Sequence, residues 1–197
     1  MYIGTARMDS WEKLHNFMKS FAAAAELHSR AAKQGCFVEC VVLSAAVIDA
    51  TLRMGLILKH QLDTSSNSLL DDLLHQEEAD NKGISEREIY KRSLSNQIID
   101  HATFDKLNNL YSRRNRVIHR YCISLITTKD VLDIASEYDE LKHEVSASVE
   151  KLEKEQIRLG VGMTLQGGTG DIADQVRDLA LGKHGDDGLA NALRNGI

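Results

Sequence analysis

The segment CFVECVVLSAAVIDATLRMGLILKH, residues 36–60, decides the fold of this chain. Wound as a helix, it places valine, leucine and isoleucine on nearly every side. Such a helix must be covered all round, so we expect it at the centre of a bundle or against a second subunit. Glu39, Asp49 and Arg53 interrupt the run, and charges are costly at bilayer depth. The segment is therefore predicted to be a buried helix of a soluble protein, with no membrane contact.

The rest of the sequence also favours helices. The chain has no proline, few aromatic residues and little β-branched alternation, which predicts an all-α helical bundle. Capping residues divide it: Asp9 or Ser10 opens a first helix, Gly35 closes it, and Thr127 or Thr128 opens a long one. The expected helices are 10–33, 36–60, a short one at 69–75 after a polar turn at 63–67, one from a capping box of Ser85 and Glu88 through Ile99, one capped by Thr103 that carries an arginine cluster, and 129–159.

The length of 197 residues is enough for one domain with its own core. We expect a helical domain over residues 1–159 and a glycine-rich tail over 160–197 that is flexible or ordered by a partner. Within the tail only 171–181 and 188–194 are candidates for short helices. The glycines at 167–170 lack the lysine and preceding strand of a phosphate loop, so they are interpreted as a linker.

The charge balance limits the function classes. With 24 basic and 29 acidic residues and a net charge of -5, the chain is not a broadly basic nucleic-acid coat protein, and any nucleic-acid contact must be local. Three cysteines without a disulfide framework fit a reducing compartment. Residues 1–10 lack the basic and apolar regions of a secretory signal. Together these features predict a cytoplasmic protein.

One segment reverses the local charge: RRNRVIHRY, residues 113–121, holds four arginines and a histidine. A titratable imidazole among fixed cations is suited to handling phosphate. Asn115 and His119 are four residues apart on one helical face, so the amide can fix the tautomer of the ring. Arg114 lies about 140° from His119 around the helix, so the two converge only if the helix distorts or a second subunit supplies its copy. Alternatively, the segment is an exposed helix end whose arginines complement the helix dipole.

The segment resembles a known motif. Residues 114–119, RNRVIH, are similar to the R-N-x-x-x-H motif of the HEPN superfamily, and Tyr121 matches the R-x4-H-x-Y form found in HEPN toxins paired with a minimal nucleotidyltransferase antitoxin. The helical arrangement is similar over 11–159, although only the motif is specific. The glycine-rich tail has no counterpart, which leaves a different HEPN branch open. The resemblance implies a HEPN-like bundle, a homodimer and endoribonuclease activity without metal or cofactor.

The resemblance also implies roles for the motif residues at a composite site shared by two subunits. RNA supplies its own nucleophile, the 2′-hydroxyl, so the protein must transfer protons and stabilise the phosphorane. His119 would transfer protons, Arg114 would hold the phosphate, and Asn115 would orient the imidazole. Further arginines would follow the RNA backbone, namely Arg113, Arg116 and Arg120.

Tyr121 matches the residue that the nucleotidyltransferase antitoxin modifies with AMP; alternatively it is a structural tyrosine at the helix end. The alternative function class is a noncatalytic HEPN-like scaffold, or an RNA-binding or nucleotide-binding subunit of a defence or toxin–antitoxin complex. A third hypothesis is an adaptor whose tail folds on a partner.

Two further sets of residues are candidates for a metal site or for buried ion pairs. Four zinc-type ligands can be collected as Cys36 with Cys40 and His119 with Cys122, but neither pair has a finger-like spacing, so no metal site is predicted. Carboxylates on an apolar helix need partners, and those at positions 39 and 49 are expected to pair with Arg114 or Arg53, or to face solvent at an edge.

Overall fold

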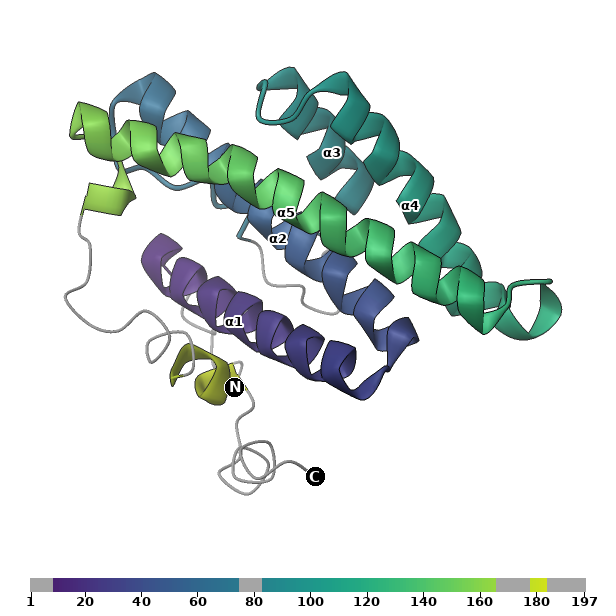
Figure 1. Cartoon of the computed structure of the whole chain (residues 1–197). Coiled ribbons are helices and arrows are strands. Elements are labelled where there is room, and N and C mark those ends of the chain that lie inside the picture. Colours follow the sequence, from purple (N-terminus) through teal and green to yellow (C-terminus); the bar gives the residue numbers. More distant parts are fainter. Residues whose placement is uncertain (1–8, 75–82, 166–177, 184–197) are drawn as a thin grey trace, which may run out of the picture.

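The computed structural model describes residues 9–74, 83–165 and 178–183 of the chain. All regular structure in these ranges is helical, which confirms the predicted all-α bundle (Figure 1). The named elements are α1 (Ser10–Gln34), α2 (Phe37–Thr64), α3 (Glu86–Ser95), α4 (His101–Arg120), the 3-10 helix η1 (Tyr121–Ile123), α5 (Thr128–Leu159) and the 3-10 helix η2 (Met163–Leu165).

Helix α2 lies at the centre of the bundle. It contacts the other four α-helices. Helix α1 lies on one side of it, α3 and α4 lie on the other, and α5 packs over it (Figure 1). Several of its side chains are fully buried, including Val41, Ile48, Leu52, Ile57 and Leu58. Its length and its mean hydropathy of 1.9 would suffice for a membrane span, but 61% of that apolar window is buried inside the bundle. The apolar segment is therefore the core helix that its sequence predicts.

The capping residues end and begin the helices largely as predicted. The Asp9 carboxylate accepts the backbone N–H of Glu12 at 2.8 Å, and Gly35 closes α1 with φ of 70°, a left-handed conformation that glycine adopts without strain. Thr127 and Asp130 form a reciprocal capping box at the start of α5. These caps set where α1 begins and ends and where α5 begins.

Several details of the predicted helices are wrong, and α2 runs to Thr64, past the end expected at residue 60 and into the expected polar turn at 63–67. Residues 71–74 form turns where a short helix at 69–75 was expected. The next helix ends at Ser95 instead of continuing to residue 99, because Gln97 adopts a positive φ of 58° that breaks the helical path. The N-cap of α4 is Asp100, whose carboxylate accepts the backbone N–H of Thr103 at 2.8 Å, so Thr103 is not the cap.

Part of the glycine-rich tail packs on the bundle. Residues 178–183 are helical, and Ala180 is fully buried against Ala22 and Ala23 of α1. The candidate helix at 171–181 is thus helical over its described residues, 178–181, and continues to residue 183, while residues 171–177 lie outside the described ranges. The glycines at 167–170 and the candidate helix at 188–194 lie outside the described residues.

Candidate functional site

The motif lies on the last two turns of α4, a helix without interruption from His101 to Arg120. Buried Leu107, Leu110 and Val117 anchor one side of this helix in the core and so fix its rotation. The regular helix leaves Arg114 and His119 about 140° apart around the axis. The distortion that would bring them together within one chain is absent from α4.

Arg114 is half-buried and held on three sides. Its Nη1 donates to Glu86 Oε2 at 2.6 Å, its Nη2 donates to the Asn115 amide oxygen at 3.1 Å, and its guanidinium lies 4.6 Å from the ring centre of Tyr111. The side chains of Arg114 and Glu86 are only 14% and 17% exposed. Burial opposes the charged form, but the hydrogen bond and the charge of Glu86 outweigh it and raise the pKa of Arg114. The arginine is therefore charged, oriented and neutralised by an internal partner.

The Asn115 amide is hydrogen-bonded to Arg114. Its amide oxygen accepts from Nε of Arg114 at 3.4 Å as well as from Nη2. In the described part of the chain, no hydrogen bond joins Asn115 to His119. Within one subunit the amide oxygen therefore orients the guanidinium, and the expected role of Asn115 in orienting the imidazole stays a prediction.

Glu86 was not among the residues singled out from the sequence. It lies in the first turn of α3, where an acidic residue is common because it complements the helix dipole, so no local signal marks it. The Tyr90 hydroxyl donates a hydrogen bond to the same carboxylate. Burial and the nearby Glu86 raise the pKa of Tyr90 above its ordinary value, so the hydroxyl stays protonated as a donor.

Of the two α2 carboxylates that the sequence singles out, Asp49 accepts from Arg53 Nε at 2.6 Å and Glu39 is exposed. Burial raises the pKa of Asp49 in spite of the neighbouring arginine. Arg53 also donates to the backbone oxygens of Leu73 and Ile84. Asp49 is therefore the partner of Arg53, and the partner of Arg114 is Glu86.

Arg114 reaches the surface through a groove of about 330 Å³ between α2, α3 and α4. The groove combines the charged residues with small and apolar ones, and its lining is Val42, Ala45, Ala46, Asp49, Glu86, Arg114 and Ile118. Val42 and Ile118 are 40% and 42% exposed, which is high for large aliphatic side chains. The guanidinium therefore lies at the edge of a surface with exposed apolar residues.

His119 is exposed on another side of α4. Its neighbours by helical spacing are Arg116, three residues before it, and Asn115, four before it. Arg116 and Arg120 are also exposed, and Arg113 pairs with Glu137 of α5. The structure thus places the imidazole beside the exposed arginines and apart from Arg114.

Tyr121 follows α4 in the short helix η1 and is 40% exposed. Its hydroxyl lies 3.4 Å from the Thr128 hydroxyl, at the outer limit of a hydrogen bond. The phenol is therefore accessible at the same end of the bundle as the motif.

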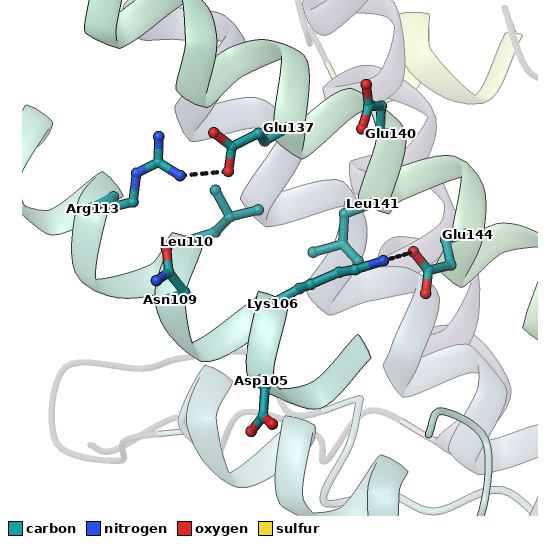
Figure 2. A pocket seen from close by; sticks show the side chains of 9 residues that line it. All are labelled: Asp105, Lys106, Asn109, Leu110, Arg113, Glu137, Glu140, Leu141 and Glu144. Atoms are coloured by element: carbon teal, nitrogen blue, oxygen red, sulfur yellow. Dashed lines mark hydrogen bonds and ion pairs between the residues drawn. The ribbon is translucent and has the colours of Figure 1, made fainter. Parts of the chain in front are cut away.

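A neighbouring groove of about 600 Å³ between α4 and α5 carries mixed charge (Figure 2). Both of its cations reach across it to carboxylates: Arg113 pairs with Glu137, and Lys106 pairs with Glu144 at 2.7 Å. Further carboxylates line it, namely Asp105 and Glu140. With its cations paired and an excess of carboxylates, this groove is not suited to binding phosphate.

The possible zinc ligands do not form a cluster. Within the described ranges, no group of three or more histidine, cysteine or acidic side chains has the geometry to hold a metal ion. Cys36, Cys40 and Cys122 are free thiols, of which Cys40 is buried and Cys122 exposed.

Comparisons of the chain with models of protein families, with curated protein sequences and with solved structures found no match.

Proposed function

We propose that the chain is a metal-independent endoribonuclease of the HEPN type, acting in the cytoplasm as a toxin or antiviral-defence effector. The observation that carries the proposal is the complete R-N-x-x-x-H motif on one regular helix, with His119 open to solvent and Arg114 at the edge of a groove. Arginine and histidine supply fixed positive charge and a proton carrier near neutral pH, which RNA cleavage requires.

The proposed active site is formed by two copies of the chain. Since Arg114 and His119 face different directions on α4, the arginine of one subunit would act with the histidine of the other. The exposed Val42 and Ile118 beside Arg114 support this arrangement, because a second copy would remove them from water.

The reaction proceeds by attack of the ribose 2′-oxygen on the adjacent phosphorus. One His119 accepts the proton of the 2′-hydroxyl as the O2′–P bond forms, and the other donates a proton to the 5′-oxygen as the P–O5′ bond breaks. Arg114 donates hydrogen bonds to the phosphorane oxygens. The products are a 2′,3′-cyclic phosphate and a 5′-hydroxyl.

The direct test is RNA digestion in EDTA with analysis of the product ends. Wild-type protein should release 2′,3′-cyclic phosphate ends, and His119→Ala should abolish cleavage without changing the circular-dichroism spectrum. His101→Ala is the matched control, since His101 is an exposed histidine at the opposite end of the same helix. Full cleavage by His119→Ala would refute the assigned role.

The composite site has its own test in sedimentation equilibrium. A dimer at micromolar concentration is expected, and Ile118→Asp should weaken it because the charge would be buried beside the apolar residues of the groove. Cleavage by a protein that remains a monomer would refute the shared site.

Tyr121 extends the proposal to regulation by a nucleotidyltransferase antitoxin. AMP on its exposed hydroxyl would place a phosphate two residues from His119 and repel the RNA backbone. After coexpression with such an enzyme, intact mass should show one added AMP, which is lost in Tyr121→Phe. An unchanged mass with a competent nucleotidyltransferase would contradict this step.

One observation favours a second candidate, a noncatalytic RNA-binding or nucleotide-binding HEPN-like subunit. Arg114 is already paired with Glu86, which offsets the charge that a phosphate would meet. In that case the exposed arginines would bind RNA, and no substrate would be cleaved. Binding without product under varied RNA substrates would select this candidate.

A further inference from the structure

A third pocket near the motif has a composition suited to a nucleotide. It measures about 580 Å³ and lies between the end of α4, the connection that follows it and the start of α5. Its lining combines arginines with aliphatic residues: Arg113, Arg116, Arg120, Ile123, Ser124, Leu125, Ile126, Asp130 and Ile134. This volume is within the range of small-molecule sites in proteins.

Among the residues that the structure describes, two cations of the pocket form no ion pair within the chain. Arg113 is paired with Glu137, and Asp130 is occupied by the capping box with Thr127. In the described part of the chain, no carboxylate forms an ion pair with Arg116 or Arg120. The two residues are four apart on one face of α4, so both guanidinium groups are available to one anionic ligand.

The pocket also presents aliphatic side chains to water. Leu125 is 100% exposed and Ile123 is 83% exposed, the two highest values among the exposed large hydrophobic residues. Leaving these side chains in water forgoes the free energy of burying them. A ligand with both phosphate and a flat apolar surface would complement the two halves of the pocket.

We infer that this pocket is a subsite for one nucleotide of a single-stranded RNA. Arg116 and Arg120 bind its phosphate, and the base packs against Ile123 and Leu125. His119 lies three residues after Arg116 and directly before Arg120, so the bound nucleotide is a neighbour of the linkage that the imidazole would serve. The inference rests on the proposed function for the choice of RNA as the ligand.

The test measures the affinity of a fluorescent 2′-O-methyl RNA 12-mer by anisotropy at several salt concentrations. This probe lacks the free 2′-hydroxyl, so binding is measured without cleavage. The double variant R116Q/R120Q should bind at least tenfold more weakly, and its salt slope should fall by about 1.4 for two lost phosphate contacts. The variant I123S/L125S should bind roughly fivefold more weakly with an unchanged slope, because it removes only base packing.

Ile157→Ser is the matched control for the aliphatic pair. Ile157 is 60% exposed near the far end of α5, so the variant should bind the RNA as the wild type does. All five substitutions in the three variants are at exposed positions and should leave the folded state intact, which circular dichroism verifies.

If I123S/L125S binds the RNA as tightly as the wild-type protein does, the proposed subsite is refuted. Binding of the same variant to phosphatidylserine vesicles is measured in parallel. If I123S/L125S keeps its RNA affinity but no longer binds the vesicles, the subsite is also refuted, and Ile123 and Leu125 are assigned to a membrane-binding surface. The proposed nuclease fails separately: if His119→Ala and wild type both leave RNA intact while the pocket variants lose affinity, the subsite stands and the catalytic proposal falls.

Discussion

Removing either member of the Arg114–Glu86 pair should destabilise the protein by about 3 kcal/mol, the lower end for breaking a buried ion pair. The lower end applies because the two side chains are still 14% and 17% exposed. Arg114→Met leaves Glu86 with the Tyr90 hydroxyl as its remaining hydrogen-bond partner among the described residues, and Glu86→Gln leaves the Arg114 guanidinium without its carboxylate. In urea, with an m-value of about 2 kcal/mol/M, the loss appears as a midpoint shift of about 1.5 M.

The control for this prediction is the adjacent pair of Arg113 and Glu137, which is 31% and 48% exposed. Arg113→Met should cost less than about 1 kcal/mol, as exposed ion pairs do. The double variant of Arg114→Met with Glu86→Gln should recover part of the loss, so that a double-mutant cycle gives a coupling free energy above about 1 kcal/mol. Additive losses, or equal losses for the two pairs, would refute the reasoning.

Two further predictions concern the bundle. A Cβ on Gly55 would lie 2.9 Å from Val149 Cγ2, so Gly55→Val should lower the free energy of unfolding by about 2–3 kcal/mol in urea denaturation, whereas Ala46→Val on the exposed side of α2 should cost only a few tenths. His28 Nε2 lies 2.8 Å from the buried Ser44 hydroxyl, and burial lowers the pKa of His28, so stability should fall as pH drops below the unfolded value of about 6.5. Thermal melts should show a smaller change between pH 7.5 and pH 5.5 in His28→Gln, and an equal change would contradict the assignment.

The sequence predicted those parts of the fold whose signals are local. The apolar segment, the helix end at Gly35 and the cap at Thr127, one of the two predicted candidates, each depend on residues within one or two turns, and each has its expected place. The end of α3 was missed because a positive φ at Gln97 has no signature in a residue that is neither glycine nor asparagine. Boundaries of this kind depend on packing that a linear pattern does not contain.

The candidate site could be predicted only in part for the same reason. Helical spacing placed Asn115 within reach of His119, but the amide oxygen accepts from Arg114. The decisive partner of Arg114 is Glu86, which is 28 residues away in the sequence on another helix. Spacing identifies which side chains share a face, whereas the packing of α3 against α4 selects the contact that forms.

The contacts of Arg114 indicate that it and the exposed arginines contribute differently to RNA binding in the proposed site. A guanidinium has five N–H donors, and three of them are engaged by Glu86 and Asn115. One donor remains on each terminal nitrogen, so Arg114 can still bind two phosphate oxygens. Because Glu86 offsets its charge, its contribution to binding RNA would come mainly from the direction of these hydrogen bonds.

Long-range attraction must then come from cations without internal partners, and Arg116 and Arg120 fit that requirement. Their loss should weaken RNA binding and its salt dependence while leaving the geometry at Arg114 unchanged. Loss of Arg114 should instead lower the turnover of bound RNA, provided that the protein remains folded after the buried pair is broken. Kinetics under single-turnover conditions separate the two contributions, because binding and cleavage are then measured independently.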